Sequence, residues 1–173
     1  MDNSFFIYLD RLILMGFFSG YPLIYLIIRM LAENNRVKSF FKTDIGSLLP
    51  FAYALVGILY LGLLLKSLYP NYSFENIKMV MQEPYLKIWG LLSILFFIPA
   101  LSKKSVLSLL HSFVFFFFLG RDILMNIFNS AEKDMLRNDM NIYTNSLLVN
   151  TAAFIFITFI YFLYTRFKKQ RGS

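Results

Sequence analysis

The chain has 173 residues, of which 58% are hydrophobic and 19% aromatic, and its formal net charge at pH 7 is +7. This apolar excess lies outside the usual balance of a soluble domain and is typical of a membrane protein. The absence of cysteine excludes disulfides, thiolate nucleophiles and cysteine-ligated metals. Because the basic residues lie at the ends of apolar blocks, we expect membrane topology rather than nucleic-acid binding to explain them.

Charged residues divide the chain into apolar blocks that are long enough for helices to cross a bilayer. We predict one all-α domain, residues 1–173, folded as a polytopic integral membrane helical bundle of about five transmembrane helices. Asp2 and Asp10 precede the first block where a signal peptide would be basic, so we expect this block to be retained as a helix. The predicted spans are residues 12–28, 45–65, 86–102, 106–128 and 146–164.

The connecting segments also carry patterns. Residues 67–83 contain apolar residues at helical spacing, which predicts a short helix lying on the outer membrane surface. These apolar residues are Phe74, Ile77, Val80 and Met81. Lys103 and Lys104 indicate a tight hairpin between the third and fourth spans. Residues 129–145 are polar, and we expect a loop there.

The distribution of Lys and Arg predicts the orientation of the bundle. With five crossings, ten of the 17 basic residues fall on the side of the C-terminus and seven on the other side. Cytoplasmic loops carry the excess of Lys and Arg, so we expect the N-terminus outside and the C-terminus inside. The abundance of Phe, Ile, Lys and Asn favours a bacterial source, and hence a bacterial inner membrane.

The fourth span carries a stripe of polar residues: Ser108, His111, Asp122 and Asn129. A helix turns by about 100° per residue, which places His111 and Asp122 within about 20° of one face. A polar group facing lipid lacks partners, so the stripe is expected to face protein or water. For His111, the only histidine, a neutral imidazole bonded to a neighbouring helix is favoured over a proton relay or an iron or metal ligand, because no second ligand lies at suitable spacing. We therefore predict no metal and no cofactor.

Two charged dipeptides are expected at the same outer level of the bundle. Asp10 and Arg11 precede the first span, and Arg121 and Asp122 lie in the outer part of the fourth. Reciprocal Asp–Arg pairs between these helices would lower the free-energy cost of holding charge near hydrocarbon. The alternative is that each dipeptide marks the membrane interface by itself.

Two further patterns predict close helix packing. Gly16 and Gly20 have the G-x-x-x-G spacing that lets two backbones approach, and Pro22 is expected to kink the helix just beyond them. In the last span, threonines recur every seven residues and so lie nearly in line, which indicates an interface with another helix of this chain or of a partner. These residues are Thr144, Thr151, Thr158 and Thr165.

The sequence contains no motif of a hydrolase, a metalloprotease or a nucleotide-binding enzyme, and we assign no catalytic residue. The favoured function is that of a non-enzymatic accessory or scaffold subunit, whose partners are the lipid bilayer and other membrane subunits or a second copy. A small transporter, or a protein that binds lipid or another hydrophobic ligand in a cavity near His111, is the second hypothesis. An intramembrane enzyme or redox component built on His111 and Asp122 is the third.

Overall fold

The computed structural model describes residues 3–33, 45–70, 72–80, 84–128 and 133–171, except for the side chains of 3–10, 79, 126, 133–136, 169 and 171. Helices make up 93% of the structure, and the described residues form no strand. The predicted all-α class is therefore confirmed. In chain order the elements are α1 (Asn3–Phe18), α2 (Tyr21–Glu33), η1 (Ile45–Leu48), α4 (Leu49–Leu68), α5 (Phe74–Val80), α6 (Pro84–Leu92), η2 (Ser93–Phe97), α7 (Pro99–Ser102), α8 (Ser105–Phe128) and α9 (Lys133–Arg171).

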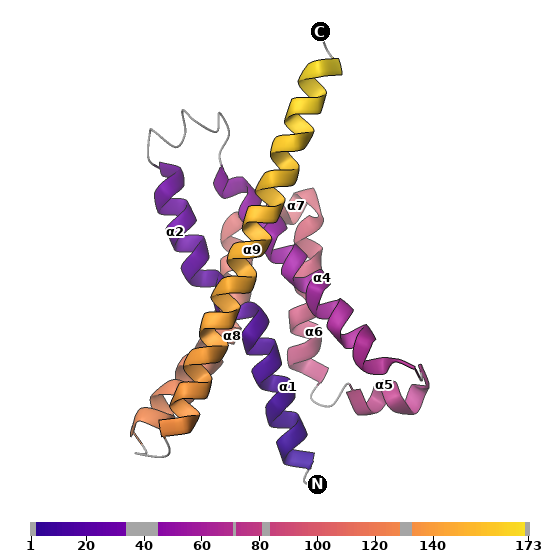
Figure 1. Cartoon of the computed structure of the whole chain (residues 1–173), viewed down its shortest axis with the longest axis vertical. Coiled ribbons are helices and arrows are strands. Elements are labelled where there is room, and N and C mark those ends of the chain that lie inside the picture. The colour runs from indigo at the N-terminus through magenta and orange to yellow at the C-terminus, as the bar shows by residue number, and fades with distance from the viewer. Residues whose placement is uncertain (1–2, 34–44, 71, 81–83, 129–132, 172–173) are drawn as a thin grey trace.

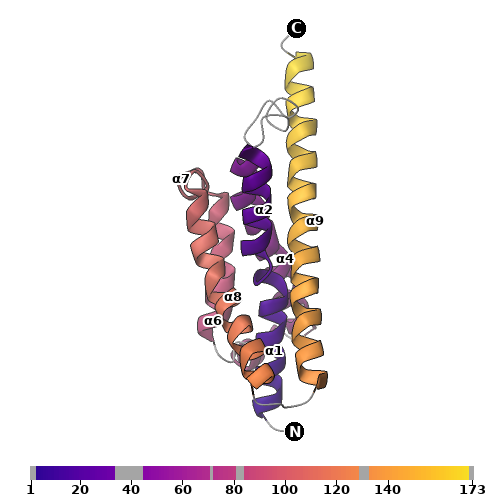
Figure 2. The ribbon, with the colours of Figure 1, turned by 90° about the vertical axis from the view of Figure 1, so that its left-hand side faces the viewer.

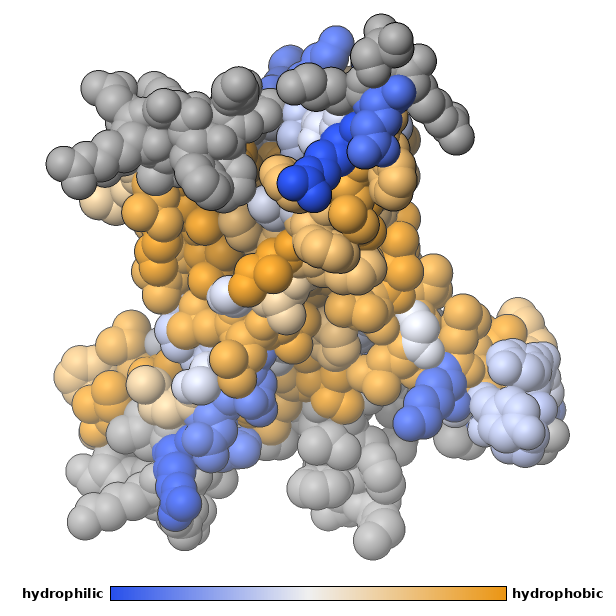
Figure 3. Space-filling view, turned by 45° about the horizontal axis from the view of Figure 1, so that its top comes forward, coloured by the Kyte–Doolittle hydropathy of each residue, from blue (hydrophilic) through white to orange (hydrophobic). Residues whose placement is uncertain are grey.

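Among the described residues, four segments are long and apolar enough to cross a membrane by length and composition: Arg11–Glu33, Ile45–Leu68, Ser105–Met125 and Arg137–Lys168. They correspond to the first, second, fourth and fifth predicted spans. The predicted third span is represented by a shorter apolar segment, Pro84–Phe97. The space-filling view shows the expected distribution, with apolar side chains across the middle of the visible face and hydrophilic ones toward its ends (Figure 3).

The helical segments run alternately in opposite directions along the long axis of the molecule (Figures 1 and 2). In the view of Figure 1, α1 and α2 rise, α4 descends, α6 to α7 rises, α8 descends and α9 rises again. The chain thus enters at one end of the bundle and leaves at the other.

The first apolar segment is broken into two helices. Pro22 has no amide hydrogen for the carbonyl of Phe18, and its ring would clash with that carbonyl in a continuous helix. Accordingly α1 ends at Phe18, and α2 begins at Tyr21 with Pro22 in its first turn. The interruption predicted at Pro22 is present, and it lies at Ser19 and Gly20, just before the proline.

A second proline interrupts the segment after α6. Pro99 cannot donate a hydrogen bond to the carbonyl of Leu95, and Ile98 donates to it instead over 2.9 Å, which is the spacing of a 3₁₀ turn. The backbone of Ile98 is extended, as is usual before proline. The chain then turns through Lys103 and Lys104 into α8, which confirms the predicted hairpin.

The connecting segments 67–83 and 129–145 are both helical in part, although the sequence predicted a helix only for the first. The short helix predicted within residues 67–83 is confirmed as α5, and Met81 lies outside the described residues. The loop predicted for residues 129–145 is wrong from Lys133 onward, because α9 begins there. Although this stretch is polar overall, its inner face is not, since Ile142 and Tyr143 pack against a small apolar cluster formed by α1 and α8.

The main core is unusually aromatic. Phe18 lies at its centre, stacked on Phe115 with 4.8 Å between ring centroids and in edge contact with Tyr53 and Tyr60. All four rings are fully buried. Aromatic pairs in these geometries add to the energy of burial, so the ring cluster fixes α1 against α4 and α8.

Candidate functional site

The inner face of α8 carries a set of buried hydroxyl groups. The hydroxyls of Tyr21 and Ser108 lie 2.7 Å apart, and the Ser108 hydroxyl donates to the carbonyl of Ser105 over 2.7 Å. Because the single proton of Ser108 is used in that bond, Tyr21 must be the donor to Ser108. One turn away, the Tyr25 and Ser105 hydroxyls lie 3.1 Å apart. These contacts join α2 to α8 through polar bonds inside an apolar core.

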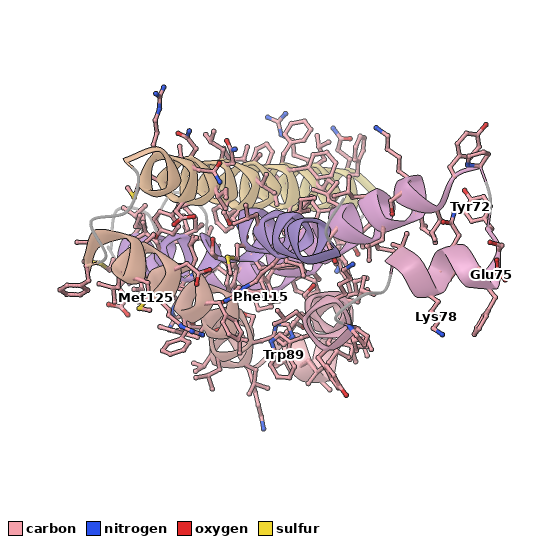
Figure 4. The ribbon with its side chains drawn as sticks, turned by 90° about the horizontal axis from the view of Figure 1, so that it is seen from below. Tyr72, Glu75, Lys78, Trp89, Phe115 and Met125 are labelled. Carbon is pink, nitrogen blue, oxygen red and sulfur yellow. The ribbon has the colours of Figure 1, made fainter. Side chains whose placement is uncertain are left out.

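His111 lies one turn further along α8, in an aromatic cage. Its Nδ1 atom is 2.8 Å from the hydroxyl of Tyr53, which comes from α4. The indole of Trp89 stacks on the imidazole with 4.6 Å between ring centroids and 4° between planes, and its Nε1–H donates to the His111 carbonyl over 3.1 Å. The edge of Phe96 completes the cage at 5.8 Å. Figure 4 labels Trp89 of α6 and also Phe115, which lies one turn beyond His111 on α8.

The second ring nitrogen of His111 has a different environment. The Nε2 atom is buried and has no hydrogen-bond partner among the described residues. The structure thus gives His111 the bond to a neighbouring helix that the sequence analysis favoured. It also leaves one polar atom of the imidazole unbonded inside the protein.

Of the two charged dipeptides, Asp10-Arg11 and Arg121-Asp122, the structure brings Arg11 and Asp122 together. Arg11 Nη2 lies 3.6 Å from Asp122 Oδ2, and the guanidinium carbon lies 4.9 Å above the ring of Phe118. Both side chains are partly buried. Arg121 is exposed, while the side chain of Asp10, and Asn129 of the predicted stripe, lie outside the described residues. Arg11 and Asp122 therefore form one half of the reciprocal arrangement that the sequence indicated.

The break between α1 and α2 is held by α9. The Gly20 amide donates to the Ser146 hydroxyl over 2.8 Å, and the side-chain amide of Asn150 donates to the carbonyl of Phe17, also over 2.8 Å. Without Ser146 and Asn150, the Gly20 amide and the Phe17 carbonyl would be unsatisfied backbone groups at a helix break in an apolar environment. We call these four residues, Phe17, Gly20, Ser146 and Asn150, the joint.

The two glycines of the predicted G-x-x-x-G pair differ in what they contact. A Cβ atom at Gly20 would lie 2.6 Å from the Leu147 backbone nitrogen, so only glycine permits this approach of α9. A Cβ atom at Gly16 would lie 3.9 Å from Ile142, which is an ordinary contact. Gly20 is thus required for the packing of α9, and Gly16 is not.

The threonine line of α9 faces away from the body of the chain, except at Thr158. Thr144, Thr151 and Thr165 are exposed and Thr158 is half-buried. The hydroxyls of Thr144, Thr158 and Thr165 donate to carbonyls of their own helix. The face of α9 that packs within the chain is marked instead by Ser146, Asn150, Ala153 and Phe154, which are buried.

A close contact between α4 and η2 was not predicted from the sequence. A Cβ atom at Gly57 would lie 2.1 Å from Ser93 Oγ, and the Ser93 hydroxyl donates to the Gly90 carbonyl over 2.6 Å. A Cβ atom at Gly90 would meet Phe18 at 2.9 Å. The signal that could have revealed these residues is the occurrence of glycine and serine within otherwise large apolar residues. The same signal marks Ser146 and Asn150, which are four residues apart.

The described residues contain no group of three or more His, Cys, Asp or Glu side chains that could hold a metal ion. What the site offers chemically is a set of buried hydrogen bonds, several of which link different helices, and the ion pair of Arg11 with Asp122. No family model, curated protein or solved structure matches the chain.

Proposed function

We propose that this chain is a non-enzymatic accessory or scaffold subunit of a membrane complex, which acts through contacts between helices. One observation carries the proposal: several polar side chains within the apolar segments bond a neighbouring helix of the bundle. Tyr21 bonds Ser108, Tyr53 bonds His111, and Asn150 bonds the Phe17 backbone. Such bonds stabilise and align helices, whereas a catalytic or transport site would require groups directed toward a substrate.

The outer surface supports a role in assembly. The threonine line of α9 offers small side chains on an exposed face, and small residues let another helix approach closely. We therefore propose this line as the contact with another membrane subunit or a second copy, because the chain's own helices pack against a different face.

We further propose five crossings, with the N-terminus outside and the C-terminus in the cytoplasm of a bacterial inner membrane. The two ends of the chain lie at opposite ends of the bundle, which supports an odd number of crossings (Figure 1). The greater number of Lys and Arg residues on the C-terminal side supports the orientation. Reporter fusions at each terminus test this, and activity of a cytoplasmic reporter at the N-terminus would contradict it.

The assembly role is tested by purification from the native membrane in mild detergent. We expect a stoichiometric second polypeptide or a homo-oligomer with the natural chain, and its loss with Thr151→Phe, which places a large ring on the threonine line. The matched control is Ala152→Phe, a similar increase in size at an exposed position of α9 that lies about 100° around the helix from Thr151, and it should retain the partner. A lone monodisperse chain, or equal loss with both variants, would overturn the assembly role.

One observation favours the second candidate, binding or transport of a hydrophobic ligand. His111 Nε2 is buried without a partner among the described residues, beside the partly exposed ring of Trp89. A ligand with one polar group could bond this nitrogen while its apolar part contacts the indole. The test is uptake or binding as a function of pH with His111→Ala, and unchanged behaviour would leave His111 with a packing role alone.

A further inference from the structure

The short helix α5 is surrounded by exposed aromatic side chains. Tyr72 is 61% exposed and Phe74 is 81% exposed, and Tyr85 at the start of α6 is 86% exposed. Tyr69 and Ile77 are also exposed. We call Tyr69, Tyr72, Phe74, Ile77 and Tyr85 the aromatic shelf. A cluster of this size is uncommon on a surface that contacts only water.

Hydrogen bonds cap α5 at its N-terminal end and tie its C-terminal end to α6. At the N-terminal end, the hydroxyl of Ser73 accepts a hydrogen bond from the backbone amide of Asn76 over 3.2 Å. The backbone carbonyl of Ser73 accepts one from the amide of Ile77. At the C-terminal end, the buried ammonium group of Lys87 donates to the Val80 carbonyl. Lys87 belongs to α6, so this bond fixes α5 to the segment that returns into the bundle.

The position of the shelf along the bundle follows from its two neighbours. It lies between the end of α4 at Leu68, where Lys66 is in the last turn, and the start of α6 at Pro84. Figure 1 shows α5 running crosswise at the foot of these two helices. In Figure 4, seen from below, Tyr72, Glu75 and Lys78 project from this corner of the molecule. If α4 and α6 cross a membrane, the shelf lies at the level where they leave its apolar interior.

We propose that the aromatic shelf inserts into the boundary between the headgroups and acyl chains of the bilayer, and that Lys87 is the positioning residue that holds it there. Tyrosine is favoured at this depth because its ring is apolar and its hydroxyl is polar. The neighbouring helices α4 and α6 also expose apolar side chains, including Leu63, Leu65, Ile88 and Leu92. The charged residues Glu75 and Lys78 complete the amphipathic pattern of an interfacial helix.

This inference rests on the proposed crossing of the membrane and on the surface position that the sequence predicts for α5, and it goes beyond both by naming the side chains that enter the lipid and the lysine that positions them. The chain contains no cysteine, so a single introduced cysteine carries a spin label without further changes. The label is placed by Phe74→Cys, and the full chain is reconstituted in phosphatidylcholine vesicles. Collision rates with oxygen, which concentrates in lipid, and with a nickel chelate, which stays in water, are then measured.

We expect the ratio of oxygen to nickel collisions to be severalfold higher at Phe74→Cys than at Glu75→Cys, the matched control on the same helix. A label at Leu59→Cys, at an exposed position of α4, reports the crossing itself. A high ratio at position 59 with equal, nickel-dominated ratios at 74 and 75 would overturn the shelf alone. A low ratio at position 59 would overturn the crossing. Low rates with both reagents at 74 would indicate a protein partner and would also overturn lipid as the occupant.

The positioning role of Lys87 has its own readout. Lys87→Met keeps a side chain of similar length but removes the donor to Val80. In the Phe74→Cys background, we expect this change to shift the collision ratio toward the nickel chelate, while the ratio at Leu59→Cys stays the same. An unchanged ratio at position 74 would show that Lys87 does not hold the shelf.

Discussion

The amide of Gly20 donates a 2.8 Å hydrogen bond to the hydroxyl of Ser146, a residue 126 positions later in the chain. The bond satisfies a backbone group freed by the break between α1 and α2, and it requires the two backbones to come close together. Within an apolar environment an unsatisfied backbone group costs several kcal/mol, so the break and its partner on α9 must be present together. The joint therefore links the first and last helical segments.

The first prediction concerns this close approach. Gly20→Ala places a methyl group 2.6 Å from a backbone atom of Leu147, and the backbone has no rotamer that relieves the contact. We expect a loss of about 1–3 kcal/mol in the free energy of unfolding, as for other overpacked sites. Unfolding by SDS from mild detergent micelles, followed by circular dichroism, measures it. The control is Gly62→Ala, where no described atom lies within 4 Å, and which should be neutral or stabilising by up to about 1 kcal/mol. Equal effects would contradict the role of Gly20.

The second prediction concerns Asn150, which donates to the carbonyl of Phe17 and to that of Ser146. Asn150→Leu has a similar size but removes the donor, and we expect a loss of about 1–2 kcal/mol in the free energy of unfolding. Ser146→Ala should be destabilising as well, because the Gly20 amide loses its acceptor. Since both residues hold the same joint, the double variant is expected to lose less than the sum. Strictly additive losses would show that the two bonds act independently.

The third prediction concerns the hydrogen bond between Tyr53 and His111 Nδ1. Tyr53→Phe and His111→Phe each remove one partner, and a double-mutant cycle should give a coupling of about 0.6 kcal/mol, the average for polar pairs between membrane helices, and at most about 1.7 kcal/mol. Trp89 is the only tryptophan and stacks on His111, so its fluorescence reports the same site. We expect an altered emission maximum in His111→Ala and little change in Tyr53→Phe. No coupling in the cycle would contradict the bond.

The fourth prediction concerns Arg11 and Asp122. Asp122→Asn removes the charge that faces the Arg11 guanidinium, and we expect a loss of about 1 kcal/mol in the free energy of unfolding, because both groups are partly buried. The reversed pair, Arg11→Asp with Asp122→Arg, should recover part of the loss seen in either single change. The control is Arg121→Gln at the neighbouring exposed position, which should stay within about 0.5 kcal/mol of the natural chain. No recovery in the reversed pair would contradict an ionic interaction.

The helical segments could be predicted because runs of apolar residues and the charges that bound them are local properties. Pro22 marked an interruption for the same reason, since its effect on the carbonyl four residues earlier is local. The polarity of residues 129–145 was misleading, because a helix can be polar on average and still bury one face. Buried Asp139 and half-buried Ile142 lie on that face.

The contacts of the candidate site could be predicted only in part. The stripe on α8 identified Ser108 and His111 as inward-facing, but their partners Tyr21 and Tyr53 depend on which helices are neighbours, and periodicity carries no such information. The threonines of α9 are evenly spaced, yet the buried face is marked by Ser146 and Asn150. Gly57 and Ser93 meet because η2 lies close to α4, and this follows from the three-dimensional arrangement rather than from either segment alone.

The closeness of Gly57 to Ser93 has a consequence for biosynthesis. The segment Pro84–Phe97 is shorter than the four candidate spans and contains Lys87, and a lysine opposes release of a nascent helix from the translocon into lipid. The missing side chain at position 57 lets this segment approach α4 closely, so α4 offers it a protein surface to pack against. We therefore expect this segment to insert only after α4, which the ribosome makes first, is already in the membrane.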